Sequence, residues 1–325
     1  MQSNDPQILP TCFGFLLLED FTLISVSSAI ETLRMANRVA ESQVYRWRMI
    51  SESGGPVSAS DGLSISVDFA IGDDVRTGEL DAVVVCGGER IERHCEKPVM
   101  HWLRACSARG LTLGSTCTGS YLLAGSGVLD GYRCSVHWEE YAALTEQFPN
   151  VTVSRSVYTI DRDRFTSSGG TAPMDMMLYF VRRQLGAEIS AGVADQFVHD
   201  RIRDTRDLQH VPLRHQVGGQ SAKLVAAVEL MESNIREPLS QVELASYVGL
   251  SRRQLQRLFQ KYLLTSPSRY YLYLRLARAR ELLFQTSMSI VEISAQAGFV
   301  SSSHFSTTYM YGPPRVCKCE VRGMG

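Results

Sequence analysis

One short pattern in the C-terminal third restricts the fold of this chain more than any other feature, because it occurs twice, about 50 residues apart. The first copy starts with Ser240-Gln241-Val242-Glu243 and the second with Ser289-Ile290-Val291-Glu292, and each is a capping box that begins a helix. A glycine follows at the same place in both copies, Gly249 in the first and Gly298 in the second. The pattern predicts two helix-turn-helix units, joined by a longer helix that starts at Pro267.

The second helix of the first unit carries a surface suited to reading base pairs. Ser251 caps this helix, which is expected to run to about residue 262. Leu255, Leu258, Phe259 and Tyr262 share its inward face, and Arg253, Gln256, Arg257 and Gln260 share the opposite face, with Arg252 at the start. Arg and Gln pair with guanine and adenine edges in the major groove. The alternative is a solvated charged face, but the turn pattern in front of the helix favours DNA.

The second helix of the second unit has a different outward chemistry. Ser301 or Ser302 begins it, and Phe305 is expected to be buried. Its outward face carries only hydroxyls, from Ser302, Ser303, Ser306 and Thr307. Hydroxyls bond phosphates or bases with little sequence preference, so we expect this helix to hold the DNA backbone. The long joining helix carries an apolar stripe of Leu272, Leu276, Ala279 and Leu283, and is expected to place the two units in successive major grooves.

Charge is distributed unevenly along the chain. The 325 residues include 33 Lys and Arg against 34 Asp and Glu. Residues 221–325 hold 13 of the basic residues but only 7 of the acidic ones, which leaves 20 against 27 for the rest. A basic C-terminal part on an acidic body indicates a polyanion as the partner of that part alone.

Composition also excludes several classes of protein. No basic-then-apolar signal stretch opens the chain, and no apolar run approaches the ~20 residues of a membrane span, so we expect a cytoplasmic protein with no membrane partner. The eight cysteines include no Cys-x-x-Cys pair, and Cys317-x-Cys319 lacks a second pair of ligands. We therefore expect buried reduced thiols, no metal and no cofactor.

The N-terminal two-thirds alternates apolar strands with helices. Strands are expected at residues 12–18, 45–51, 81–86 and 111–115, with a helix after the first strand and another from Gly119. This order predicts a flavodoxin-like α/β domain, with a mainly parallel sheet and helices on both faces. We expect this domain over residues 1–203, a linker over 204–220, and an all-α DNA-binding domain with its two helix-turn-helix units over 221–325.

A candidate ligand site follows from that topology. Ligands of such sheets bind beyond the carboxyl ends of the strands, which brings Gly87-Gly88 and the segment from Ser115 to Gly119 to one rim. Cys117 stands between a strand and a helix, as a nucleophile on a sharp turn would, and the helix N-terminus behind it would favour the thiolate. A small thiol in a tight turn explains the same position equally well.

The region from about residue 224 to 314 resembles the AraC/XylS DNA-binding domain. The resemblance rests on Leu244-Ala245, Gly249-Leu250-Ser251, Leu255-Gln256-Arg257-Leu258-Phe259, Ala277-Arg278-Ala279, Gly298-Phe299 and Ser303-His304-Phe305-Ser306. It implies that Arg253, Gln256 and Arg257 read bases. One departure is that Met310-Tyr311-Gly312-Pro313-Pro314 arrives about three residues early, so we expect a shortened last helix and a weaker second DNA contact.

The N-terminal region resembles the PfpI/ThiJ-like class I glutamine amidotransferase fold, and specifically the GlxA subfamily of regulators. The residues that carry this resemblance are Gly14-Phe15-Leu16-Leu17-Leu18, Gly87-Gly88, Cys117-Thr118-Gly119, Leu122-Leu123-Ala124, Leu129-Asp130-Gly131, His137-Trp138-Glu139, Ser168-Gly169-Gly170-Thr171-Ala172 and Asp175. Enzymes of this superfamily place an acid opposite the thiol, and the resemblance puts Ser25 at that position. A serine cannot act as a general acid or base near neutral pH, so we expect a binding pocket without catalytic residues.

Together these features predict a ligand-responsive DNA-binding transcription regulator, an activator by resemblance. The expected partners are double-stranded promoter DNA, a small-molecule effector, a second copy of the chain and RNA polymerase. Residues expected at the effector site are Gly87, Gly88, Cys117, Thr118, His137 and Trp138. The opening stretch 13–37, with Tyr45-Arg46-Trp47 and residues 58–62, resembles regulators of glycine betaine and carnitine catabolism. The alternative is a PfpI-like enzyme that uses Cys117 and carries an appended DNA-binding domain.

Overall fold

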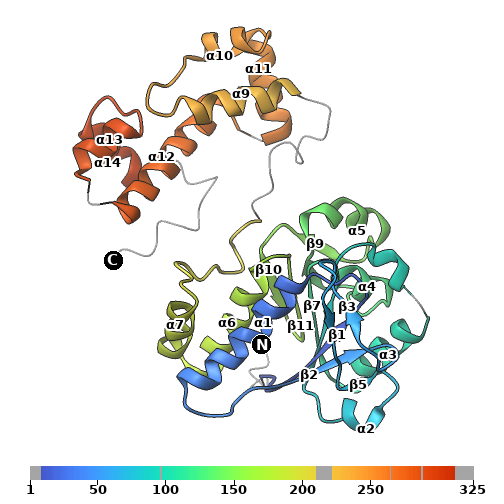
Figure 1. Cartoon of the computed structure of the whole chain (residues 1–325). Helices are drawn as coiled ribbons and strands as arrows, with labels where there is room; N and C mark the ends of the chain where they lie inside the picture. Colours follow the sequence, from blue (N-terminus) through green and yellow to red (C-terminus); the bar gives the residue numbers. More distant parts are fainter. Residues whose placement is uncertain (1–8, 96, 210–221, 264, 287, 312–325) are drawn as a thin grey trace, which may run out of the picture. The chain divides into compact units, whose positions relative to one another are not determined.

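The computed structural model describes residues 9–95, 97–209, 222–263, 265–286 and 288–311. The chain forms two compact units, Met1–Gln209 and His210–Gly325, and each unit has its own core (Figure 1). Among the described residues, no helix is both long enough and apolar enough to cross a membrane.

The first unit is an α/β domain. Its strands are β1 (Cys12–Leu17), β2 (Arg46–Ser51), β3 (Val57–Ser58), β4 (Ser64–Ile65), β5 (Phe69–Ala70), β6 (Ala82–Cys86), β7 (Thr112–Thr116), β8 (Arg133–Ser135), β9 (Thr152–Ser154), β10 (Tyr158–Asp161) and β11 (Arg164–Ser167). Its helices are α1 (Leu23–Val39), α2 (Asp74–Thr77), η1 (Ile91–His94), α3 (Lys97–Ala108), α4 (Ser120–Gly125), η2 (Trp138–Glu140), α5 (Tyr141–Gln147), α6 (Ala172–Leu185) and α7 (Ala187–Gln196). The strands expected from the sequence correspond to β1, β2, β6 and β7.

The main sheet has the strand order β10-β11-β7-β6-β1-β2-β5, and every pairing in it is parallel except that of β10 with β11. The predicted fold class, a mainly parallel sheet with helices on both faces, is therefore confirmed. Because β6 and β7 are neighbours in register, the turns that follow Cys86 and Thr116 meet at one edge of the sheet.

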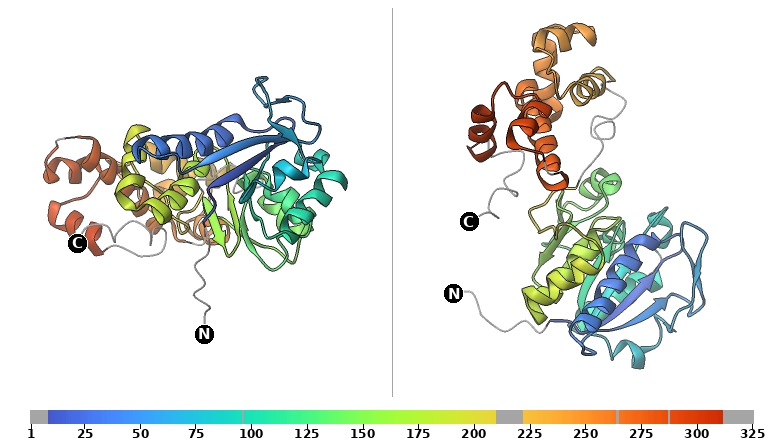
Figure 2. Two further views of the ribbon diagram at one scale, coloured as in Figure 1. Left: turned by 90° about the horizontal axis from the view of Figure 1, so that it is seen from below. Right: turned by 60° about the vertical axis from the view of Figure 1, so that its left-hand side comes forward.

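Alternate residues of the central strands enter two separate cores. On β1, Phe13 and Phe15 point into the core formed with α1, α6 and α7, whereas Leu16 points into the core formed with α3 and α4. These helices cover opposite faces of the sheet, as Figures 1 and 2 show. All three side chains are fully buried, which explains why this strand is apolar on both sides.

The boundary of the first unit lies farther along the chain than the predicted start of the linker at residue 204. Asp207 is buried, and its carbonyl accepts a hydrogen bond from the Val157 backbone N–H at 2.8 Å. The Gln209 side-chain amide donates to the carbonyls of Val136 at 2.9 Å and Ser156 at 3.1 Å. Residues 204–209 therefore belong to the α/β domain, and the remainder of the predicted linker, 210–220, lies outside the described residues.

The second unit is helical in the part that the structure describes. Its helices are α9 (Ala222–Ser233), α10 (Gln241–Tyr247), α11 (Arg252–Leu263), α12 (Pro267–Gln285), α13 (Ile290–Gln296) and α14 (Ser302–Tyr311). One core lies among α9, α10, α11 and the start of α12, and the other lies among the rest of α12, α13 and α14. The predicted stripe on α12 lines the second core, where Ala279 is fully buried. The early Gly-Pro-Pro, which predicts a shortened last helix and a weaker second DNA contact, lies within residues 312–325, outside the described part.

Candidate DNA-binding and effector sites

The two helix-turn-helix units have matching turns. After α10, the Leu250 N–H donates to the Ala245 carbonyl at 2.8 Å, and after α13, the Phe299 N–H donates to the Ser294 carbonyl at 2.8 Å. Each turn contains a glycine with a positive φ, 62° at Gly249 in the first and 72° at Gly298 in the second. Both predicted capping boxes are also present, so these local predictions are confirmed.

Helix α11 begins as predicted and exposes most of the predicted base-reading side chains. Ser251 Oγ accepts the Gln254 N–H at 3.2 Å, and Gln254 Oε1 accepts the Ser251 N–H at 2.8 Å. This is a third reciprocal cap. Leu255 and Phe259 are fully buried, while the side chains of Arg253, Gln256, Arg257 and Gln260 lie on the exposed surface. A row of guanidinium and amide groups on one helix face has the donors and acceptors for bidentate contacts with purine bases.

Arg252 differs from its neighbours on α11. Its Nε donates to Gln241 Oε1 at 2.9 Å, which ties the start of α11 to the start of α10. Gln241 in turn donates to Ser268 at the start of α12. Arg252 therefore has an intramolecular bond that a base contact would have to replace, and it is better placed to orient α11 or to meet a phosphate.

Helix α14 presents the predicted hydroxyl surface. Ser301 is the cap residue, since its Oγ accepts the His304 N–H at 3.2 Å, and Phe305 is buried as predicted. Ser303 and Thr307 are exposed, and Ser302 and Ser306 are half-buried. This face has no charged side chain, so it lacks the groups that distinguish one base pair from another most strongly.

Two residues of α12 that the sequence analysis did not select fix the joining helix to the two units. The Tyr271 hydroxyl donates to the Asn234 carbonyl at 2.6 Å and accepts the Leu239 N–H at 3.3 Å. The Arg275 guanidinium donates to the carbonyls of Ala297 at 2.9 Å and Gly298 at 2.6 Å, at the end of α13.

Arg275 also stacks on the Phe299 ring, with its Cζ 4.2 Å from the centroid. Burial lowers the pKa of this guanidinium, which nevertheless stays charged because its ordinary pKa is so high. A cation at a helix C-terminus is stabilised by the free carbonyls there. The available sequence signal was an arginine within the apolar stripe, between Leu272 and Leu276.

In the α/β domain, the loops at the carboxyl ends of β6 and β7 meet as predicted. A Cβ on Gly87 would lie 2.3 Å from the Gly119 nitrogen, and one on Gly88 would lie 1.9 Å from the Asp20 carbonyl oxygen. The Thr118 hydroxyl donates to the Gly88 carbonyl at 2.8 Å. Gly87 and Gly88 are buried, and their main role is to let these loops touch.

Cys117 occupies the predicted sharp turn, with a positive φ of 57°. Its carbonyl accepts the His137 N–H at 3.0 Å, and its Sγ lies 3.5 Å from the Thr22 hydroxyl. A Cβ on Gly169 would lie 3.3 Å from this sulfur and 2.8 Å from the His137 ring. The thiol, the imidazole and the Gly169 backbone therefore converge at one point.

The protonation of Cys117 is opposite to the prediction made from the helix behind it. Burial raises the pKa of the thiol, and the negative charges of Glu139 and Glu140 raise it further, against hydrogen bonds from Thr22 and the Thr118 backbone. Burial also lowers the pKa of His137. Burial thus disfavours the charged forms of both groups, the thiolate and the imidazolium, and works against the ion pair of an activated cysteine.

In the described part of the chain no carboxylate hydrogen-bonds the sulfur, although the charges of Glu139 and Glu140 act on it. Ser25 is fully buried, and its hydroxyl has no hydrogen-bond partner among the described residues. Asp20 is turned to an ion pair with Arg90 instead. The groups that hydrogen-bond the thiol are the Thr22 hydroxyl and backbone. The titratable side chain beside it is the His137 imidazole, whose pKa burial lowers.

The three tryptophans divide between core and rim. Trp102 is buried in the core under α3 and α4, and Trp47 packs against the opposite core. Trp138 is half-exposed, with its ring centroid 5.3 Å from that of His137. Only Trp138 remains in a position to meet a cationic ligand at the Cys117 rim.

Comparison with known proteins agrees with this architecture. The DJ-1/PfpI family matches residues 14–183, and a helix-turn-helix domain matches residues 244–310. A crystal structure of an AraC family transcriptional regulator from Pseudomonas putida superposes with a TM-score of 0.53 and 32% identity, covering 58% of this chain and 100% of that one. The fold and these matches define a two-domain transcription regulator with a DJ-1/PfpI domain and a helix-turn-helix domain.

Full-length relatives have the same organisation. The HTH-type transcriptional regulator GbdR of Pseudomonas aeruginosa is 53% identical over 317 residues, or 97% of this chain and 84% of that protein. GlxA of Rhizobium meliloti, another HTH-type transcriptional regulator, is 34% identical over 298 residues, or 91% of each chain. The chain belongs to this family of HTH-type transcriptional regulators. The predictions of a DNA-binding regulator and of a chain that is not an enzyme are both confirmed by these relatives.

Proposed function

We propose that this regulator is a cytoplasmic, effector-responsive activator whose DJ-1/PfpI domain binds a small amine or amino-acid-like compound at the Cys117 rim. The observation that carries the proposal is the chemistry of that rim. The sharp turn of the superfamily is kept, but its thiol is buried and its pKa is raised. The resemblance puts Ser25 at the position of the superfamily's acid. A site that keeps this shape but has a serine in place of the superfamily's acid is suited to binding.

The effector is expected to contact the side chains that border this point. Thr118, His137 and Trp138 offer a hydroxyl, a neutral imidazole and an indole, and the acidic Glu139 lies 3.4 Å from His137 Nδ1. An indole next to carboxylates favours a cationic head group. With the resemblance to regulators of glycine betaine and carnitine catabolism, this makes quaternary amines the first compounds to test.

The response to the effector is expected to act through a dimer. Two chains would present two pairs of recognition helices to paired half-sites in a promoter, and the effector would shift the population of dimers that can engage both. Base selection would come from Arg253, Gln256, Arg257 and Gln260, while Ser302, Ser303, Ser306 and Thr307 would hold the backbone. RNA polymerase is the expected partner once the dimer is bound.

Calorimetric titration of the full-length chain tests this proposal. The panel comprises quaternary amines, simple amines, amino acids and aldehydes, and product formation is followed in the same samples. Micromolar binding of one class without turnover is the expected result. Silence across the panel, or turnover that disappears in Cys117→Ala, would contradict an effector-binding role for this rim.

Cys117→Ser separates sensing from DNA binding. The substitution keeps the size of the side chain but changes its contact with Thr22, so operator affinity is expected to stay within about twofold, since the site is in the other unit. The effector concentration for half-maximal promoter induction should rise. An unchanged induction curve would remove Cys117 from the sensing mechanism.

A further inference from the structure

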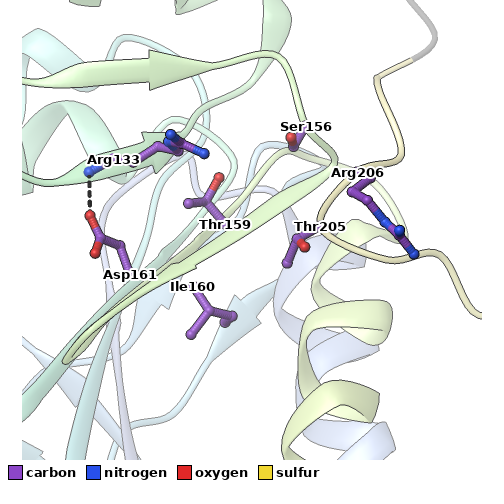
Figure 3. A pocket seen from close by; sticks show the side chains of 7 residues that line it. All are labelled: Arg133, Ser156, Thr159, Ile160, Asp161, Thr205 and Arg206. Carbon is purple, nitrogen blue, oxygen red and sulfur yellow. Dashed lines mark hydrogen bonds between the residues drawn. The ribbon is translucent and has the colours of Figure 1, made fainter. Parts of the chain in front are cut away.

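The α/β domain has a polar cavity of about 300 Å³ whose lining shares no residue with the Cys117 rim. It lies between β8, β10 and the segment that ends the first unit. Its lining residues are Arg133, Ser156, Thr159, Ile160, Asp161, Thr205 and Arg206 (Figure 3). The volume is at the lower end of the range for small-molecule sites.

Hydrogen bonds within the domain fix the strand side of this cavity. Thr159 is buried, and its hydroxyl lies 2.7 Å from that of Ser135. The Asp161 carboxylate accepts the Arg133 backbone N–H at 2.8 Å, drawn as a dashed line in Figure 3. These bonds hold β8 and β10 together on this side of the cavity, whereas the side chains of Arg133, Thr205 and Arg206 are exposed.

The opposite wall, Thr205 and Arg206, is held by anchors on both sides. Before it, Arg203 binds the fully buried Asp175 through its backbone N–H at 2.7 Å and its Nε at 2.8 Å. After it, Asp207 and Gln209 make the backbone and side-chain bonds to residues 136, 156 and 157 described above. The wall is thus fixed in place, although it belongs to the last segment before the residues that lead to the DNA-binding unit.

The charged groups of the lining differ in how far they are already neutralised. Arg206 pairs with Asp204 at 2.8 Å, and its side chain points away from Arg133 in Figure 3. Asp161 accepts bonds from the Arg133 backbone and from Arg162 Nε at 3.2 Å. The Arg133 guanidinium makes no hydrogen bond or ion pair with the part of the chain that the structure describes, although its positive charge helps to lower the pKa of Asp161. It is the cation of the lining whose donors are available to a ligand.

We propose that this cavity binds the carboxylate of a small organic anion through the Arg133 guanidinium, with the hydroxyls of Ser156 and Thr205 beside it. Guanidinium and carboxylate match in a planar, two-bonded geometry. The negative charge of Asp161 in the same lining disfavours a doubly charged phosphate. This site is independent of the amine effector proposed for the Cys117 rim.

Occupancy of the cavity has a structural consequence. A ligand held by Arg133 on β8 would also contact Thr205, so it would add a bond between the sheet and the segment that ends the first unit. Because that segment is already anchored on both sides, the added bond is expected to stabilise the first domain against unfolding rather than to move the segment.

Calorimetric titration of the full-length chain with acetate, succinate and inorganic phosphate tests the assignment. Arg133→Gln removes the charge, and Thr205→Glu, at an exposed position, places a tethered carboxylate at the cavity mouth. Arg48→Gln makes the same change as Arg133→Gln at an exposed strand position of β2 outside the cavity, and is the matched control.

Acetate or succinate is expected to bind, with an affinity about tenfold or more weaker in Arg133→Gln and Thr205→Glu and unchanged in Arg48→Gln. Equal binding to Arg133→Gln, tighter binding of phosphate than of either carboxylate, or no binding at millimolar concentration would overturn the proposal. Amine binding at the Cys117 rim should be the same in all four proteins. Its loss in every protein would contradict the proposed effector, and not the carboxylate site.

Discussion

The two helix-turn-helix units of the C-terminal domain have the same backbone design and different surfaces. Each has a capping box, a positive-φ glycine and a buried aromatic on its second helix, Phe259 in one and Phe305 in the other. Yet α11 exposes guanidinium and amide groups, whereas α14 exposes hydroxyls. The buried residues set the fold and the exposed residues set the function, so duplicated folds can divide the work between base selection and backbone anchoring.

The largest expected difference between the units concerns their turn glycines. A Cβ on Gly298 would lie 2.2 Å from the Ile235 carbonyl oxygen, but one on Gly249 meets nothing closer than Lys223 Nζ at 3.7 Å. Gly249→Ala should cost about 1–2 kcal/mol of unfolding free energy from the positive φ alone. Gly298→Ala adds a backbone clash and should cost about 3 kcal/mol or more. Thermal unfolding of both variants measures this, and equal losses would mean that the two turns are equivalent.

The DNA-facing helices should differ next most strongly. Arg257→Ala is expected to weaken operator binding by about 1–3 kcal/mol, because it would remove the two-bonded base contact proposed for this residue. Ser303→Ala should weaken it by less than about 1 kcal/mol, since a hydroxyl makes one neutral bond. Fluorescence anisotropy with operator and unrelated DNA separates the two roles. An equal loss on both DNAs for Arg257→Ala would make it a phosphate contact and break the proposed division of work.

The anchors of α12 provide a third comparison. Arg275→Lys loses the two bonds to the carbonyls of Ala297 and Gly298 and should destabilise the second helix-turn-helix unit by about 1–2 kcal/mol. Tyr271→Phe loses one hydroxyl and should destabilise the first helix-turn-helix unit by about 1 kcal/mol. Hydrogen exchange of α13 against α10 assigns each loss to its unit. Arg269→Lys, at an exposed position of the same helix, is the control and should have no effect.

The smallest effect tests the feature in which the two units are alike. Hydrogen bonds from Ser240 lower the pKa of Glu243, and hydrogen bonds from Ser289 lower the pKa of Glu292. A lowered folded-state pKa gives stability that is present above the carboxyl's ordinary pKa and is lost as the pH falls through the lowered value. Glu243→Gln and Glu292→Gln should therefore each lower the melting temperature slightly at neutral pH and match the parent protein in acid. Unequal losses would show that the two caps are not equivalent.

Much of the architecture was predictable because its signals are local. Ser240, Ser251 and Ser289 lie within a few residues of the amides they cap, so residue types and spacing were sufficient. Strands β1 and β6 were predictable from continuous apolar runs, which reflect burial on both faces, whereas the short strands β3, β4, β5, β8, β9, β10 and β11 were not predicted. The resemblance to two known families added the order of the domains, and the full-length relatives agree with it.

The features that escaped prediction depend on partners distant in the chain. Asp207 and Gln209 were assigned to a linker, because their neighbours in the sequence do not reveal that they hydrogen-bond to residues 136, 156 and 157. Arg275 was not selected from the sequence, because only the folded chain shows that it donates to a carbonyl at the end of α13. The sequence left two interpretations of Cys117 open, because it shows the helix behind the thiol but not the burial that raises its pKa.

The sequence by itself determined where helices and strands begin, which residues alternate between core and surface, and which two families the chain resembles. These depend on chemistry within one or two turns of the backbone. Tertiary structure decided which charges are free: Arg252 is held by Gln241, Arg206 by Asp204, and Arg133 by no described partner. It also decided that the pKa of Cys117 is raised, since desolvation depends on everything packed around a group, and only the folded chain brings those residues together.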